Sequence, residues 1–330
     1  MSHTSSYFIG RSPVPTPAVP PGPARAPALA VHPALRLLAA GVCCLLALGL
    51  VGLVFVWTQP GQWVDGLLLP RAERGGGYAQ PGGLFEPATV VLRHFGHPAL
   101  LAVLLAAVLV VGALGRRLLP GVVGVGLVLG AVLVAGAAKS ALPRPELAVA
   151  GSTTHNSFPS GHVAVAAALA LAFLLVTPDA ARRWLVVPGA AGVSVIGAAT
   201  MIAGWHRFSD VLGGVLVSLT LFCLAAAGLA VRVGGDTRRP AAAPRSGRVW
   251  RALAQGAVGL LVLVWAVRVL LPGLAAELRW GPLVAVLAAT GLTVLALGGA
   301  AFLVRSMEFV GSTRPAGRRA HSIDEREQYS

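Results

Sequence analysis

Three short polar clusters stand against apolar segments of the sequence, and their residue types could together bind and transfer a phosphoryl group. They read KSALPRP from Lys139, FPSGH from Phe158 and WHRFSD from Trp205. Polar side chains at the edge of a lipid bilayer are costly to bury unless they meet partners or water. The clusters therefore indicate a functional site at the boundary of a membrane.

The cationic and hydroxyl residues of these clusters supply the donors that a phosphate group requires. Lys139 and Arg144 carry positive charge, and the guanidinium group can bind two phosphate oxygens at once. Ser160 stands at a predicted helix start, where the backbone N–H groups of Gly161 and His162 favour an anion. Lys139 is also the one lysine among 26 basic residues, which marks its position as special.

His162 and His206 permit phosphoryl transfer without a metal or cofactor. One imidazole can attack phosphorus to form a covalent intermediate, while the other gives a proton to the leaving oxygen. Asp210 follows His206 by four residues, so its carboxylate can fix the tautomer of that ring and stabilise its positive form. Because no cysteine, histidine or carboxylate residues cluster at metal-ligand spacing, we expect neither metal nor cofactor here.

The composition places these clusters in a membrane protein. The 330 residues are 56% hydrophobic and 12% charged, with a mean hydropathy of +0.77, which is too apolar for one soluble core. Cys43, Cys44 and Cys223 lie in apolar segments and indicate neither a disulfide framework nor a metal site. The net charge of +14 comes from arginines scattered over short loops. That scatter is typical of cytoplasmic helix ends and not of nucleic-acid binding.

The apolar segments predict an all-α, polytopic membrane helical bundle. Eight segments can span about 30 Å of hydrocarbon: residues 35–57, 98–115, 118–138, 161–177, 184–204, 210–232, 252–271 and 281–304. The first six form a predicted six-helix core, and two C-terminal transmembrane helices follow. The predicted domains are a disordered cytoplasmic tail (1–33), the core (34–232), a basic cytoplasmic linker (233–251), the two additional helices (252–304) and a cytoplasmic tail (305–330).

The distribution of basic residues predicts the orientation of the chain. With the N-terminus in the cytoplasm, eighteen of the 26 lysine and arginine residues lie on the cytoplasmic side. Both termini are then cytoplasmic. The loops at 139–160 and 205–209 share the extracytoplasmic face, so we expect a multi-pass plasma-membrane protein with its active site outside.

The order of the motifs resembles the phosphatidic acid phosphatase type 2 superfamily, which also includes vanadium haloperoxidases. The resemblance covers about residues 98–232 and rests on FPSGH at 158–162 and HRFSDVLGG at 206–214. It implies a six-helix core with an extracytoplasmic site. It also implies a role for each site residue. His206 is the nucleophile, Asp210 is its carboxylate partner and His162 is the acid. The phosphate group is bound by Lys139, Arg144, Ser160 and Gly161.

Two features depart from the pattern of that superfamily. The first motif is two residues shorter than usual between its lysine and Arg144, so strict counting would select Glu146 instead. The Ser-Arg pair that usually precedes the third-motif histidine is replaced by Ala199 and Thr200. Arg207, which adjoins the predicted nucleophile, is the candidate for the missing phosphate-binding arginine.

Together these features predict an integral membrane phosphatase that hydrolyses a lipid phosphate or a prenyl diphosphate through a phosphohistidine intermediate. Its partners are the lipid bilayer and a lipid phosphate substrate, with no nucleic acid. The missing arginine leaves one alternative, a lipid-phosphate binding or transport protein of the same fold with impaired catalysis. A vanadate-dependent oxidase with the same anion pocket is disfavoured, because the related oxidases are soluble.

Overall fold

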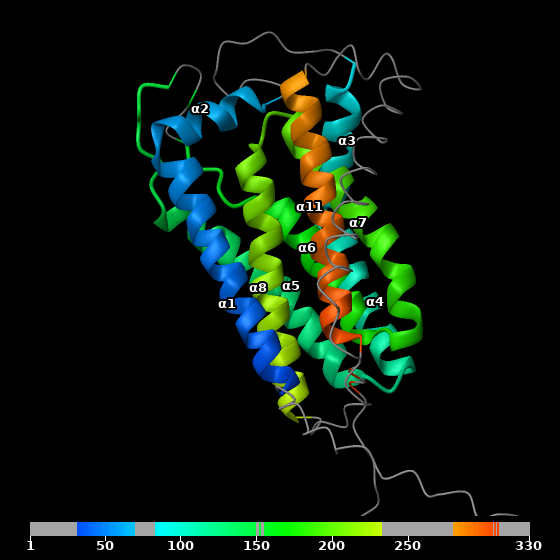
Figure 1. Cartoon of the computed structure of the whole chain (residues 1–330). Coiled ribbons are helices and arrows are strands. Elements are labelled where there is room, and N and C mark those ends of the chain that lie inside the picture. Colours follow the sequence, from blue (N-terminus) through cyan, green and yellow to red (C-terminus); the bar gives the residue numbers. More distant parts are fainter. Residues whose placement is uncertain are drawn as a thin grey trace, which may run out of the picture. The chain divides into compact units, whose positions relative to one another are not determined.

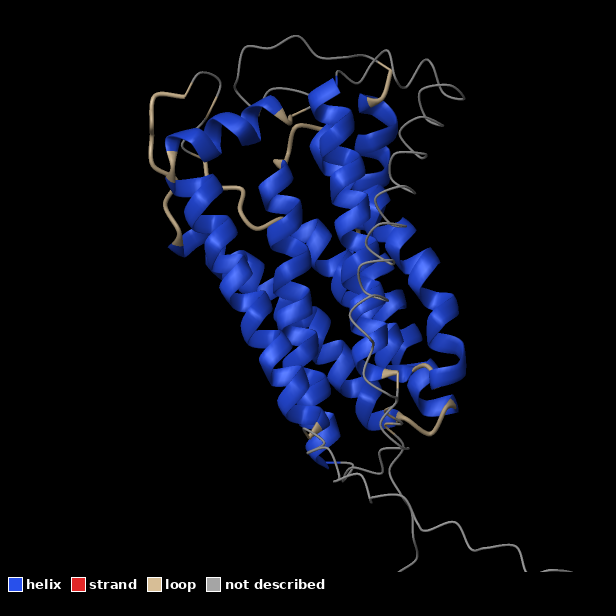
Figure 2. Ribbon diagram, viewed as in Figure 1, coloured by secondary structure: helices blue, strands red, loops and turns tan. Residues whose placement is uncertain are grey.

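The computed structural model describes residues 32–69, 83–149, 152, 155–232, 280–305, 307 and 309. Within these residues every regular element is helical and no strand occurs (Figure 2). The all-α fold predicted from the apolar segments is therefore confirmed for the described part of the chain. The predicted helix at 252–271, the linker at 233–251 and most of both tails lie outside the described residues.

The helices follow one another along the chain, and the longest described connection in its central part is the loop between Ala141 and Gly161 (Figure 1). They are α1 (Pro33–Val51), a π-helical turn η1 (Gly52–Val56), α2 (Gln59–Leu67), α3 (Phe85–Phe95), α4 (Pro98–Leu114), α5 (Leu118–Ala141), α6 (Gly161–Val176), α7 (Asp179–Ile202), α8 (Phe208–Arg232) and α11 (Trp280–Val304).

Five segments of the described chain are long and apolar enough to cross a membrane: Pro33–Val56, Leu118–Ala141, Asp179–Ile202, Phe208–Arg232 and Leu283–Val304. The segment predicted at 98–115 corresponds to α4, which passes the same test only together with α3, across a bend of 57°. α6 has 16 residues. At about 1.5 Å per residue it covers less than the hydrocarbon thickness of about 30 Å.

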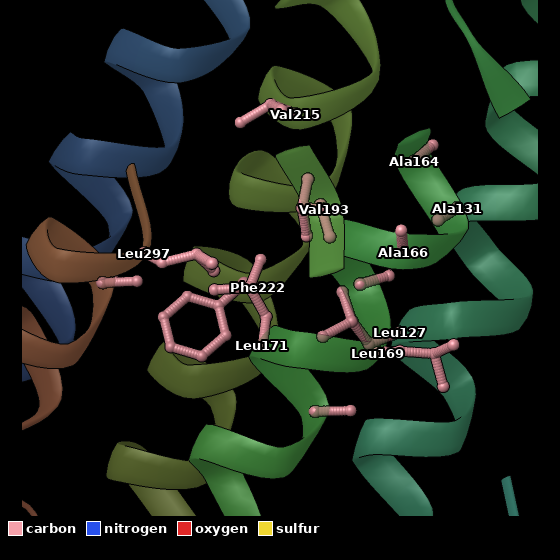
Figure 3. Packing of buried hydrophobic residues seen from close by; sticks show 14 of the residues in the cluster. Leu127, Ala131, Ala164, Ala166, Leu169, Leu171, Val193, Val215, Phe222 and Leu297 are labelled. Atoms are coloured by element: carbon pink, nitrogen blue, oxygen red, sulfur yellow. The ribbon is translucent and has the colours of Figure 1, made fainter. Parts of the chain in front are cut away.

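α6 is the central helix of the bundle and is buried along most of its length. It packs against α5, α7 and α8, while α1 lies along α8 (Figure 1). Figure 3 shows Leu169 and Leu171 of α6 among side chains that include Leu127 of α5 and Phe222 of α8. Because α6 packs against other helices along most of its length, it can be shorter than a membrane-spanning helix without exposing its backbone to lipid.

The last helix of the described residues, α11, packs against α7, α8 and α6. A buried arginine of α7, Arg182, links it to the core. Its Nη1 donates to the carbonyl oxygens of Val304 and Met307, at 2.6 and 2.8 Å, at the C-terminal end of α11. Its Nε donates to the carbonyl oxygens of Leu174 and Thr177 at the end of α6, both at 3.0 Å. One guanidinium group therefore caps two helices.

Two short helices, α2 and α3, lie outside every segment predicted from the sequence. α2 begins after Thr58, whose hydroxyl accepts the N–H of Gly61 at 3.1 Å and donates to the carbonyl of Val54 at 2.6 Å. The chain folds back so tightly here that a Cβ on Gly61 would overlap the carbonyl oxygen of Val54. Only glycine fits this turn, which directs α2 across the end of the bundle (Figure 1).

The polarity of α2 is the reverse of that in a helix on a soluble protein. Its buried residues are Gly61, Gln62 and Asp65, whereas Trp63 and Leu67 are 57% and 55% exposed. A helix at the surface of a water-soluble domain buries its apolar side. The inverted pattern of α2 is expected where the bundle end holds a polar site and the outer side meets the membrane interface.

Candidate active site

His206 and Asp210 form a hydrogen-bonded pair between the end of α7 and the first turn of α8. His206 Nδ1 lies 3.3 Å from Asp210 Oδ2, and both side chains are buried. Because an ionised carboxylate only accepts hydrogen bonds, Nδ1 carries the proton of the neutral ring. The lone pair is then on Nε2, on the opposite side of the ring from Asp210. This is the tautomer that a histidine nucleophile requires.

The backbone holds this pair in a tight turn after α7. The N–H groups of Trp205 and His206 both donate to the carbonyl oxygen of Thr200, at 3.0 and 3.2 Å. Gly204, between them and the helix, has φ of 67°, a conformation that glycine adopts without strain. The third motif therefore ends one helix, reverses direction and starts α8 within a few residues.

Asp210 also receives hydrogen bonds from outside the pair. Its Oδ2 accepts the hydroxyl of Ser157 at 2.6 Å and the backbone N–H of Arg207 at 2.9 Å. The Ser157 oxygen in turn accepts a hydrogen bond from Arg207 Nη1 at 3.2 Å. Ser157 is a site residue that the sequence motifs did not reveal. Its one signal was its position directly before FPSGH, at the end of a loop rich in serine and threonine.

His162, the predicted acid, faces His206 from the first turn of α6. The two ring centroids are 6.5 Å apart with an interplanar angle of 62°, and Trp205 lies 5.7 Å from His162. A nucleophile needs about 3–3.5 Å to its target atom, and an acid about 2.6–3.2 Å to the oxygen it protonates. The separation of the rings is thus suited to one phosphoryl group between them.

The break between α3 and α4 lies against His162. A Cβ placed on Gly96 would be 3.3 Å from His162 Nε2. Gly96 itself is exposed at the C-cap of α3. This contact was not foreseen, because Gly96 lies far from the motifs in sequence.

Lys139 and Ser160 meet at the start of α6. Lys139, in the last turn of α5, brings its Nζ to 3.7 Å from the position that a Cβ on Gly161 would occupy. Ser160 caps α6 by accepting the N–H of Val163 at 3.5 Å, and its own N–H donates to the carbonyl of Asp210 at 2.9 Å. The helix start, with its unpaired N–H groups, therefore lies beside both an ammonium group and the His206–Asp210 pair.

Arg144 is buried in the loop after α5, whereas Glu146, the other residue that motif counting offers, is exposed. Arg144 Nη2 donates to the hydroxyl of Ser152 at 3.3 Å. Its Nε and Nη1 are buried and have no hydrogen-bond partner among the described residues. Burial lowers the pKa of Arg144, and the carboxylates of Asp210 and Asp65 oppose that shift. A buried guanidinium group with two unused donors is suited to an anionic ligand.

Arg207 is 2% exposed and lies beside the same two carboxylates. Burial lowers its pKa, while the charges of Asp210 and Asp65 raise it. Thr200, where the resemblance leads one to expect an arginine, is fully buried, and its hydroxyl donates to the carbonyl of Gly197 in its own helix at 2.8 Å. The positive charge beside Asp210 and Asp65 is therefore carried by Arg207, and Thr200 contributes none.

Asp65 of α2 is a second carboxylate that the sequence motifs did not reveal. Its two oxygens accept the backbone N–H and the hydroxyl of Ser209, at 3.0 and 2.5 Å. Burial and the nearby charge of Asp210 raise the pKa of Asp65 to about 7, against the opposing effects of Ser209 and Arg207. A lone aspartate in a short, unpredicted helix carries no sequence signal of its own.

The structure thus brings all eight predicted site residues to one end of the bundle. Among the described residues, no group of three or more histidine, cysteine, aspartate or glutamate side chains could hold a metal ion. What the residues offer is two facing imidazoles, a buried aspartate behind one of them, and three cations whose charges interact with that aspartate. These groups are Lys139, Arg144, Ser160, Gly161, His162, His206, Arg207 and Asp210.

The helical bundle, its membrane-length helices and this group of residues define a phosphatase-like integral membrane protein. The family comparison agrees: the model of the PAP2 superfamily matches residues 98–232. The resemblance found in the motifs is therefore confirmed over this range. Comparisons with curated proteins and with solved structures gave no match.

Proposed function

We propose that the protein is an integral membrane phosphatase that hydrolyses a lipid phosphate or a prenyl diphosphate through a phosphohistidine on His206. One observation carries the proposal. The imidazole of His206, held by Asp210 through Nδ1, faces the imidazole of His162 at a centroid distance of 6.5 Å. This separation is on the scale of one phosphoryl group and its leaving oxygen held between the two rings.

In the first step, the Nε2 lone pair of His206 attacks phosphorus, and a nitrogen–phosphorus bond forms as the bond to the ester oxygen breaks. The leaving oxygen takes a proton from the imidazolium of His162, and the lipid alcohol departs. The His206 ring becomes positive in this step. The negative charge of Asp210, which is fully buried, stabilises that positive ring.

In the second step, a water molecule attacks phosphorus on the side that the alcohol has left. His162, now neutral, accepts a proton from the water, and the nitrogen–phosphorus bond breaks to return His206 to its starting form. The products are inorganic phosphate and the free enzyme. With a diphosphate substrate the same steps apply, and the leaving group is a lipid monophosphate in place of an alcohol.

Cationic side chains stabilise the phosphoryl oxygens through both steps. Lys139 lies beside the start of α6. Arg144 contributes Nε and Nη1, the two buried donors that lack a partner among the described residues. Such preorganised donors act most strongly on the charge that develops in the transition state. Arg207, which is tied to the pair through Ser157, supplies a third cation.

The proposal includes the orientation predicted from the basic residues. The site lies on the extracytoplasmic face of the plasma membrane, and both termini lie in the cytoplasm. Substrates are then lipids of the outer leaflet whose phosphate groups lie at the level of the helix start.

The direct test is phosphate release from a panel of lipid phosphates and prenyl diphosphates by the purified protein in detergent, with excess chelator present. We expect release by the wild type and none by His206→Ala. A denaturing quench at alkaline pH, during turnover of a substrate labelled in the transferred phosphate, should trap a phosphoprotein that survives alkali and is hydrolysed by acid. Turnover by His206→Ala at the wild-type rate, or complete loss of activity in chelator that magnesium restores, would refute the mechanism.

Thr200 supports a second candidate function, because it stands in the place of an arginine and its hydroxyl bonds within its own helix. This candidate is a lipid-phosphate binding or transport protein with impaired catalysis. It predicts that the wild type binds lipid phosphates, releases no phosphate from any of them, and loses binding when Arg144 is replaced by alanine.

A further inference from the structure

The buried side of α2 contacts both loops that form the site. Gln62 and Asp65, three residues apart, lie on the same side of the helix and are 1% and 0% exposed. Gln62 reaches the loop that carries Arg144, and Asp65 reaches the turn that carries His206. α2 lies outside residues 98–232, the range that matches the superfamily.

Gln62 uses both ends of its amide group. Its Nε2 donates to the carbonyl oxygens of Val56 and Pro145, at 2.8 and 3.0 Å. Its Oε1 accepts the hydroxyl of Ser152 at 2.9 Å. The Ser152 oxygen accepts a hydrogen bond from Arg144 Nη2 at 3.3 Å. Gln62 therefore contacts the residue after Arg144 through the backbone and Arg144 itself through one bridging hydroxyl.

Asp65 attaches the same side of α2 to the turn that carries His206. Its carboxylate accepts two hydrogen bonds from Ser209, which stands between Arg207 and Asp210 in the sequence. Two hydrogen bonds from one residue to this fully buried carboxyl group define its position. The position of Gln62 is thereby set relative to the nucleophile as well as to its own helix.

We propose that Gln62 is a positioning residue for phosphate binding, and that α2, anchored by Asp65, is the support from which it orients Arg144. Held by Ser152 through Nη2, the guanidinium group keeps Nε and Nη1 for the ligand. Without Gln62, Ser152 loses its acceptor, and Pro145 loses a donor. Arg144 then samples other rotamers, and ordering it on binding costs part of the affinity.

The inference rests on the phosphate site of the proposed function, and its test uses binding so that the two can fail separately. The probe is inorganic phosphate, titrated into purified full-length protein in detergent, with the dissociation constant read by calorimetry. The variants are Gln62→Ala, Ser152→Ala, Arg144→Ala and the double variant of Gln62 and Arg144. Gln59→Ala is the matched control, because Gln59 belongs to the same helix and is exposed.

We expect Gln62→Ala and Ser152→Ala each to weaken phosphate binding by about tenfold. This is the effect of losing one hydrogen bond in the series that links Gln62 through Ser152 to the charged Arg144. Arg144→Ala should weaken it further. The double variant should bind no more weakly than Arg144→Ala alone, because Gln62 acts through Arg144. Gln59→Ala should match the wild type. Ser152→Ala, in a loop, keeps the test open if Gln62→Ala does not fold.

Wild-type affinity in both Gln62→Ala and Ser152→Ala would overturn the inference, as would fully additive losses in the double variant. A wild type that binds no phosphate would overturn it as well. If phosphate binding depends on Gln62 and Ser152 in this way but no lipid ester is hydrolysed, the proposed hydrolysis fails and the positioning role of Gln62 stands.

Discussion

The hydroxyl of Ser157 donates to Oδ2 of Asp210 at 2.6 Å, across 53 residues of sequence. The same oxygen of Asp210 accepts a hydrogen bond from His206 Nδ1, and the Ser157 oxygen accepts a hydrogen bond from Arg207. Ser157 therefore connects the carboxylate behind the proposed nucleophile with a proposed phosphate-binding cation. Both groups should depend on it.

Replacing Ser157 by alanine should lower turnover by about tenfold to a hundredfold. The change leaves Arg207 Nη1 without this acceptor and removes one donor from Asp210, and a buried hydrogen bond lost in this way costs about 1–3 kcal/mol. The measurement is kcat with a lipid phosphate substrate in detergent. Ser140→Ala is the control, because the exposed Ser140 hydroxyl donates to the carbonyl oxygens of Gly136 and Ala137 in its own helix. Equal kcat values for the two variants would contradict the role of Ser157.

Replacing Arg207 by alanine should lower kcat/KM by at least about a hundredfold. A charge-assisted contact to a transferring phosphoryl group contributes several kcal/mol to transition-state stabilisation, and each factor of ten corresponds to about 1.36 kcal/mol. Thr200→Ala should change kcat/KM only slightly, because its hydroxyl bonds within its own helix. Both variants need an unfolding temperature near that of the wild type for the comparison. Near-normal kinetics of Arg207→Ala would favour the binding-protein candidate.

Replacing Gly96 by valine should reduce turnover while leaving the fold intact. A side chain at this position would begin 3.3 Å from His162 Nε2, where a leaving group would lie. Gly96 has φ of −76° and ψ of −1°, which a residue with a side chain can adopt, and the Leu92 carbonyl oxygen, 3.1 Å from the new Cβ, must move by a few tenths of an ångström. Gly136→Val, on α5, is the control, because a Cβ there meets nothing within 4 Å. Unchanged kcat in Gly96→Val would show that the α3–α4 break does not border the reaction.

A cysteine at Glu146 should react with a membrane-impermeant thiol reagent in intact cells. Glu146 is exposed in the loop of the first motif, which the positive-inside rule places outside. The background needs Cys43, Cys44 and Cys223 replaced by serine. Ala180→Cys, exposed at the opposite end of the bundle, should be labelled only after permeabilisation. The reverse pattern would invert the proposed topology and the leaflet that supplies substrate.

Replacing Arg182 by alanine should destabilise the protein strongly. Its side chain donates to four carbonyl oxygens at the ends of α6 and α11, and carbonyl groups buried without a donor are costly. We expect a loss of about 3 kcal/mol or more in unfolding free energy. The neighbouring Arg183 is exposed, so Arg183→Ala should be near neutral. The measurement is reversible unfolding in detergent micelles, and equal stability of the two variants would contradict the capping role.

The helices that the sequence predicts are those whose signal is local. α5, α7 and α8 are long apolar segments, and the free energy of placing such a segment in lipid depends on its own side chains. The start of α6 is equally local, since Ser160 caps the helix with its own hydroxyl. The motifs also predicted that all eight site residues lie at one end of the bundle, because the membrane-length segments between the motifs return the chain to the same face.

Other features followed from tertiary structure alone. α2 and α3 are short, and α2 buries polar residues, so neither has the apolar length or the period by which a helix is recognised. The bonds of Asp65 to Ser209, across 144 residues, and of Ser157 to Asp210 join residues that no local pattern links.

The sequence by itself determined the membrane helices and the chemical types gathered at one end of the bundle, because hydrophobic transfer and helix capping act over neighbouring residues. Tertiary structure decided which hydrogen bonds hold those groups. His206 is oriented by Asp210, Asp210 by Ser157, and Arg144 by Ser152. Each of these bonds needs a side chain to be placed within about 3 Å of its partner, and only the packing of the helices and their loops fixes that distance.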